Sequence, residues 1–86
     1  MKPVDMLSLD LRSLATFVAV LDEGSVSRAA VRLGVTQSAV SHTLERLRQA
    51  FGDPLFVKSG RGIVPTDYAL RTGPHIRQLL DDLRTL

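Results

Sequence analysis

Polar side chains that can hydrogen-bond to base edges gather between residues 36 and 42. The run reads Thr-Gln-Ser-Ala-Val-Ser-His. Glutamine can bond adenine bidentately, serine can serve several bases, and histidine can donate to guanine. A plain surface helix would carry lysine and glutamate instead. We therefore predict contacts with DNA bases in the major groove from Gln37, Ser38, Ser41 and His42.

A second group of candidates lies some twenty residues further along the chain. Arg61 stands between two glycines, where a slim cationic tip can enter a minor groove or lie on the DNA backbone. Lys58 precedes this tip and is placed to meet a phosphate. Thr36 is expected to cap a helix first and to contact a phosphate second.

The spacing of the candidate catalytic and metal-binding residues does not match the motifs that such sites require. Gly60-Arg61-Gly62 begins like a dinucleotide fingerprint, but Pro65 stands where a third glycine belongs. Ser41 and His42 are neighbours on one expected helix, so their side chains diverge by about 100° and form no nucleophile–base pair. His42 and His75 have no companion ligands at metal spacing, and the chain has no cysteine. We predict no enzyme activity, no metal and no cofactor.

Hydrophobic periodicity supplies the elements that must position these groups. It predicts helices over residues 9–23, 25–33, 36–51 and 66–86, with a hairpin over 55–65. Asp10 or Ser8 is the expected cap of the first helix, and Ser25, Thr36 and Thr66 are the caps of the others. The fold class is mainly α, a winged helix-turn-helix of three helices and a two-stranded wing, followed by a long helix. We place the boundary between residues 1–65 and 66–86.

The last expected helix has more apolar surface than so small a domain needs. Its hydrophobic residues recur near heptad spacing, which predicts a homodimer seam formed by Ile76, Leu79, Leu80 and Leu83. The alternative is that Ile76, Leu80 and Leu83 pack into the core of the chain itself. Gly73-Pro74 interrupts this pattern, because proline removes a backbone donor and clashes with the preceding turn. We expect a kink at this point, or a break.

Length, composition and charge limit the possible settings. The 86 residues make one domain, and 44% of them are hydrophobic. The longest apolar run, residues 17–21, is too short to span a bilayer, and no signal peptide opens the sequence. We expect no membrane association and a cytoplasmic, nucleoid-associated protein. The net charge is only +2, and the excess of positive charge lies in residues 35–65, which contain four cationic and two anionic side chains.

The order of residues across these elements resembles a known family. The run Ser25-Val-Ser-Arg-Ala-Ala-Val-Arg-Leu-Gly-Val-Thr-Gln-Ser-Ala-Val-Ser-His42 is followed by Leu47, Phe51-Gly52, Pro54-Leu55-Phe56, Arg61-Gly62 and Pro65-Thr66. Together they strongly resemble the N-terminal DNA-binding domain of LysR-type transcriptional regulators. The resemblance covers nearly the whole chain from residue 9.

The resemblance implies a winged helix-turn-helix whose last helix, the linker helix, pairs with its twin in a dimer. It implies base contacts from Gln37, Ser38, Ser41 and His42, although His42 holds a place often filled by arginine. Backbone or wing contacts would fall on Ser27, Thr36, Lys58 and Arg61. We thus expect sequence-specific binding of double-stranded DNA at an inverted-repeat operator.

Members of this family continue into an effector-binding domain, so we expect this chain to be a fragment and any small-molecule inducer to bind only through the missing domain. The alternative function is a winged-helix protein-interaction module without DNA binding. Salt distinguishes the two functions, because counterion release makes DNA binding fall steeply with salt.

Overall fold

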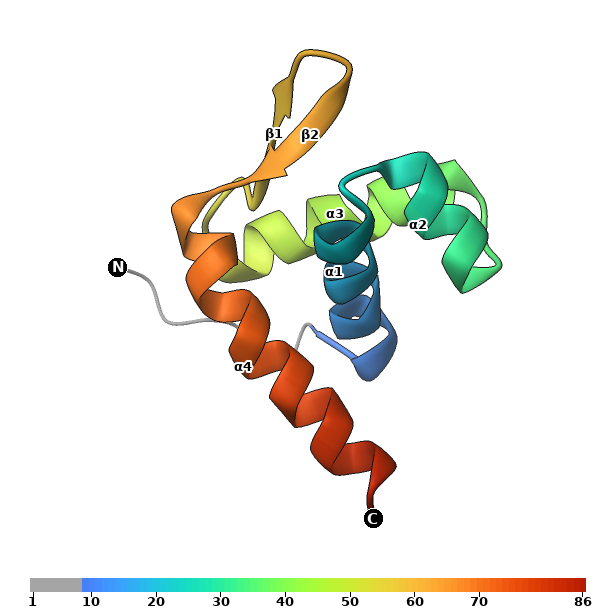
Figure 1. The fold of residues 1–86 in the computed structure, drawn as a ribbon, viewed down its shortest axis with the longest axis vertical. Helices are drawn as coiled ribbons and strands as arrows, with labels where there is room; N and C mark the ends of the chain where they lie inside the picture. The colour runs from blue at the N-terminus through green and yellow to red at the C-terminus, as the bar shows by residue number, and fades with distance from the viewer. Residues whose placement is uncertain (1–8) are drawn as a thin grey trace.

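Four helices and one hairpin make up the described chain. The computed structural model describes residues 9–86, with the elements α1 (Leu11–Glu23), α2 (Val26–Leu33), α3 (Gln37–Phe51), β1 (Phe56–Ser59), β2 (Gly62–Pro65) and α4 (Asp67–Arg84). Figure 1 shows α1 crossing α3, with the hairpin projecting from one side and α4 running away from the other. The predicted winged helix-turn-helix fold class is confirmed.

Each helix begins at a side chain that accepts a backbone hydrogen bond from its first turn. The acceptors are Asp10, Ser25, Thr36 and Thr66, all in extended backbone. Asp10 is the cap of α1, so this helix begins two residues later than the predicted residue 9, because the cap itself is not helical. The other predicted cap, Ser8, lies outside the described residues.

The core lies between α1, α3 and the base of the hairpin. Phe17 is fully buried, and its ring packs edge-on against those of Phe51 and Phe56 at centroid distances of 6.0 and 5.7 Å. The predicted inward stripe of α3 is also buried, with Val40, Leu44, Leu47 and Phe51 in the core cluster. The opposite face of α3 is thereby turned to solvent.

The hairpin is anchored to the helices at its base. β1 and β2 are antiparallel, and Val57 pairs with Val64. Leu55, just before β1, is fully buried and has a positive φ of 66°. Its N–H donates to Asp53 Oδ1 at 2.8 Å, and its carbonyl accepts from the N–H of Thr66 at 2.9 Å. These bonds hold the wing at a fixed place beside α3 and α4.

The Gly73-Pro74 pair does not break the last helix. α4 runs from Asp67 to Arg84 through both residues, and Figure 1 shows one unbroken helix. Pro74 is exposed, whereas Gly73 is buried against α1. An internal proline costs a helix about 3 kcal/mol. Packing of the buried face of α4, which includes Gly73 and Ile76, against the core offsets this cost. The possible break is therefore not found, and the expected kink stays a prediction.

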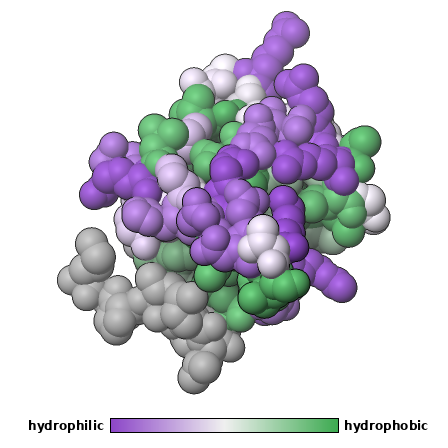
Figure 2. All heavy atoms as spheres, turned by 60° about the horizontal axis from the view of Figure 1, so that its bottom comes forward, coloured by the Kyte–Doolittle hydropathy of each residue, from purple (hydrophilic) through white to green (hydrophobic). Residues whose placement is uncertain are grey.

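The predicted seam of α4 divides between the interior and the surface. Ile76 is 6% exposed and belongs to the core, and Leu80 packs against it. Leu79 and Leu83 are 44% and 38% exposed. Figure 2 shows another aspect of the surface, where hydrophilic side chains cover the centre and hydrophobic residues are exposed around them. Within residues 9–86, no helix is long and apolar enough to cross a membrane.

Candidate nucleic-acid interface

A tight turn sets the angle between α2 and α3. Gly34 adopts a φ of 69°, which glycine reaches without strain. The N–H groups of Gly34 and Val35 donate to the carbonyls of Val31 and Ala30 at 3.2 and 3.0 Å. The small buried side chains of Ala29 and Ala30 let the neighbouring helices approach closely. The turn therefore presents the first residues of α3 at the molecular surface.

The side chains predicted to read bases are all exposed on α3. They are Gln37, Ser38, Ser41 and His42. Within the described part of the chain, no side-chain hydrogen bond or ion pair engages any of them. Their donors and acceptors are therefore satisfied by water and are free to exchange it for a partner.

Thr36 combines two predicted roles in one hydroxyl group. Its Oγ1 accepts from the N–H of Ala39 at 3.0 Å, and the residue is exposed. A hydroxyl that accepts one bond still has a hydrogen to donate. The cap is confirmed, and the phosphate contact stays a prediction.

The β1–β2 hairpin, which is the wing, and the helix-turn-helix together form a basic groove of about 390 Å³, here called the wing groove. Four of the predicted contact residues line it, namely Ser27, Gln37, Lys58 and Arg61. Arg28 also lines the groove and was missed from the sequence, because nothing in its local pattern distinguishes it from a solvated helix residue. No acidic side chain belongs to the lining. Three cations around one groove favour an anionic partner.

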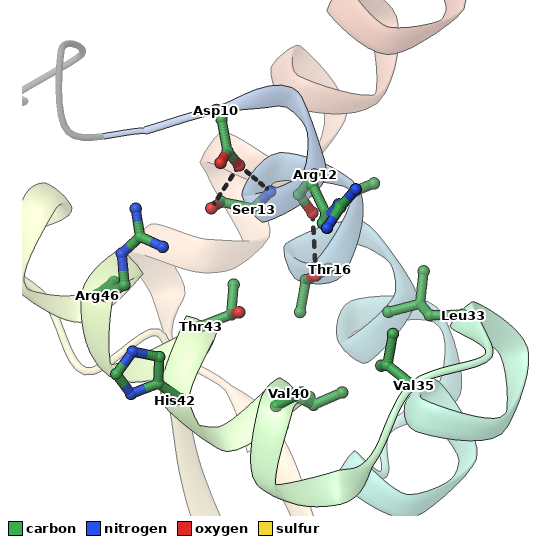
Figure 3. Close-up of a pocket in the computed structure, with 12 residues that line it drawn as sticks. Asp10, Arg12, Ser13, Thr16, Leu33, Val35, Val40, His42, Thr43 and Arg46 are labelled. Carbon is green, nitrogen blue, oxygen red and sulfur yellow. Dashed lines mark hydrogen bonds between the residues drawn. The ribbon is translucent and has the colours of Figure 1, made fainter.

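A second hollow, of about 580 Å³, lies on the other side of α3 (Figure 3). His42 and Arg46 line it from α3, and Arg12 lines it from α1. Asp10 also reaches its edge, where the backbone N–H and the hydroxyl of Ser13 donate to Asp10 Oδ1 at 2.7 and 2.8 Å. These hydrogen bonds hold the pKa of Asp10 below its ordinary value.

The predicted base contacts thus fall on two flanks of one helix. Gln37 borders the wing groove, and His42 borders the hollow beside α1. About 140° separates the two positions around the helix, since five residues turn it by 500° at about 100° each. A helix lying in a groove presents such flanks to its two walls. This geometry suits a helix that is surrounded by its partner on three sides.

The sequence of residues 11–70 matches the family described as "Bacterial regulatory helix-turn-helix protein, lysR family". The chain belongs to the LysR family. It is 41% identical over 76 residues to the HTH-type transcriptional regulator PhcA of Ralstonia nicotianae, and the match covers 88% of this chain and 22% of PhcA. The chain spans about a quarter of the length of such relatives, which are named as transcriptional regulators.

Solved structures of a transcriptional regulator and of a domain bound to DNA show the same fold. The probable transcriptional regulator PA0477 from Pseudomonas aeruginosa is similar with a TM-score of 0.87 and 35% identity, over 93% of this chain and 27% of that one. The domain in the complex of CbnR_DBD with DNA is similar with a TM-score of 0.84 and 28% identity, over 90% of this chain and 88% of that one. The second comparison covers nearly all of a domain that was solved on DNA.

Proposed function

We propose that this chain is the DNA-binding domain of a LysR-family transcriptional regulator and that α3 enters the major groove of double-stranded DNA. The observation that carries the proposal is the exposed polar face at the start of α3, whose side chains have no partner among the described residues. Gln37, Ser38, Ser41 and His42 are the proposed base contacts. Similarity to a domain solved with DNA supports the same conclusion.

The wing groove has a separate role in this proposal. Lys58 and Arg61 contact the backbone or the adjacent groove, together with Ser27 and Thr36, and Arg28 adds a third cation to the same wall. Phosphate contacts of this kind fix the register of a protein on the duplex without reading its sequence. They also make affinity depend on salt.

Pairing through α4 completes the proposed reader. Residues 1–65 would form the reading unit and residues 66–86 the pairing helix, with Leu79 and Leu83 offering the exposed part of the seam. Leu80 and Ile76 would support the seam from within the chain. A twofold dimer reads two half-sites in opposite directions, so an inverted repeat is the expected operator.

Selection from a random duplex library, sequenced after binding at two salt concentrations, tests the proposal. An enriched inverted repeat is expected, and its retention should fall steeply at the higher salt. An enriched single half-site would keep α3 as the reader and overturn pairing by this chain alone. A chain that retains no duplex at low salt would contradict DNA binding and favour the protein-interaction module.

A further inference from the structure

α1 and α4 approach each other closely where they cross. Gly73 is buried there, and a Cβ atom added to it would lie 2.4 Å from Leu21 Cδ2 and 3.9 Å from the ring of Phe17. Ile76, one turn further along α4, is 6% exposed in the same core. The absence of a side chain at residue 73 therefore sets how deeply α4 seats on α1. This explains a glycine inside a helix, which is otherwise unfavourable.

An ion cluster beside this crossing ties three helices together. Asp22, at the end of α1, accepts from both terminal nitrogens of Arg77 on α4, one of them at 3.1 Å to Oδ2. The same Oδ2 accepts from Nη1 of Arg32 on α2 at 2.9 Å. The arginine–carboxylate fork constrains direction as well as distance. Glu23 lies 3.5 Å from Arg32 and adds a second acid at this end of α1.

The cluster differs from the other ion pairs of the described chain in what it connects. Arg71–Asp67, Arg84–Asp81 and Arg48–Glu45 each join residues three or four positions apart on one helix. Arg77 and Asp22 are 55 residues apart. Unlike these three pairs, the cluster around Asp22 joins α4 to α1 and α2, and it therefore resists rotation of α4 relative to them.

We propose that Gly73, Asp22 and Arg77 are positioning residues that fix the direction of α4 relative to α3 and thereby set the spacing between DNA half-sites. The inference rests on the proposed function. In a dimer paired through α4, each α3 is placed by the angle at which α4 leaves its own domain. A rotation of about 10° at the crossing moves a point about 20 Å away by about 3.5 Å, which is one base-pair step. A loosened joint should therefore blur spacing and leave half-site reading intact.

The test measures affinity for duplexes that carry the selected half-site as an inverted repeat, with the spacing changed one base pair at a time. The wild-type chain should prefer one spacing, and Arg77→Ala should reduce that preference by about threefold, the effect expected for one ion pair at a partly exposed site. Arg71→Ala is the matched control, since it removes an arginine from the same helix but breaks only a pair within α4. Arg77→Lys should restore part of the preference, because it keeps the charge but not the fork.

Binding to a duplex with a single half-site distinguishes a failure of the proposed function from a failure of the positioning role. If the wild-type chain binds neither the inverted repeat nor the single half-site, the proposed function fails. If Arg77→Ala binds the single half-site like the wild type but shows an unchanged spacing profile, the positioning role is overturned while the proposed function stands. A lower affinity for the single half-site in Arg77→Ala would also overturn the positioning role, because the residue would then act on reading itself.

A readout without DNA tests the same joint. The chain has no cysteine, so cysteines introduced at Val31 on α2 and Gln78 on α4 are unique spin-label sites. Both residues are exposed. The distance distribution between them should broaden in Arg77→Ala and shift in Gly73→Leu, whose side chain Leu21 and Phe17 leave no room for. Equal distributions in the wild type and in Arg77→Ala would contradict the inference.

Discussion

The start of α3 and the crossing of α1 with α4 use polar side chains in opposite ways. At the start of α3, residues such as Gln37 and His42 are exposed and have no side-chain partner among the described residues. At the crossing, Asp22 holds Arg77 and Arg32 through several hydrogen bonds. Polar groups left to water are available to a partner, whereas groups that bond each other fix geometry. The difference separates reading from positioning within one small domain.

The largest expected effect belongs to the core beneath both regions. Phe17→Ala removes a fully buried ring that packs on two others, and it should cost about 3–5 kcal/mol of the free energy of unfolding. Urea unfolding followed by circular dichroism measures this cost. A loss below about 1 kcal/mol would show that the three rings do not form one core.

Gln37→Ala should act on reading alone. Loss of a bidentate base contact should weaken binding to the selected duplex by about 1–3 kcal/mol, relax specificity at that base pair and leave unfolding unchanged. Gln78→Ala is the matched control, because its amide bonds only Asp82 on α4. Fluorescence anisotropy with selected and scrambled duplexes measures both variants. Unchanged affinities for Gln37→Ala would contradict the assignment of α3 as the reading helix.

Two threonine caps should differ in their effect on DNA binding. Thr36→Ala and Thr66→Ala each remove a side-chain acceptor from a helix start, and each should lower the free energy of unfolding by about 1 kcal/mol. Thr66 also donates to Asp53 at 2.8 Å, so its effect should be the larger. Only Thr36→Ala should also weaken DNA binding, since its hydroxyl is exposed. Equal binding by both variants would remove the phosphate contact from Thr36.

Lys58→Ala should weaken all duplexes alike. Removing one phosphate contact should reduce the slope of log affinity against log salt by about 1 and leave sequence preference unchanged. Arg71→Ala removes the same charge from α4 and should leave the slope as it is. A changed sequence preference in Lys58→Ala would mean that the wing stem reads bases.

Acid should loosen the α1–α4 crossing. The hydrogen bond from Arg77, with that from Arg32, holds the pKa of Asp22 below its ordinary value. A lowered folded-state pKa gives stability that is present above the unfolded pKa, about 3.9, and is lost as pH falls through the folded value. Asp22→Asn should therefore show a smaller loss of stability than the wild type between pH 5 and acid, measured by thermal unfolding. Parallel curves for the two proteins would contradict the linkage.

Local signals were sufficient to predict most of the fold. Capping side chains, terminal glycines and apolar stripes gave the helices and the hairpin, because each signal lies within a few residues of its effect. The same local rule left open a break at Gly73-Pro74, which the continuous α4 does not show. The local rule is correct, but contact with Leu21, some fifty residues away, overrides it. Periodicity also could not separate Ile76, which is buried, from Leu79, which is exposed.

The candidate site was predictable in part. The exposed face of α3 follows from its stripe, and the structure confirms that exposure. The convergence of Arg28 with the wing, and the cluster of Asp22 with Arg77, depend on packing between distant segments. Base and phosphate contacts stay predictions until they are measured with DNA.

The most direct test of the separation between reading and positioning is an NMR titration of the isotope-labelled chain with the selected duplex. We expect large chemical-shift changes at Gln37, Ser38, Ser41 and His42 and at the wing tip around Arg61. We expect small changes at Asp22, Gly73 and Arg77, which stay in place on binding. Changes confined to the crossing or to the outer face of α4, with the start of α3 unaffected, would contradict this separation.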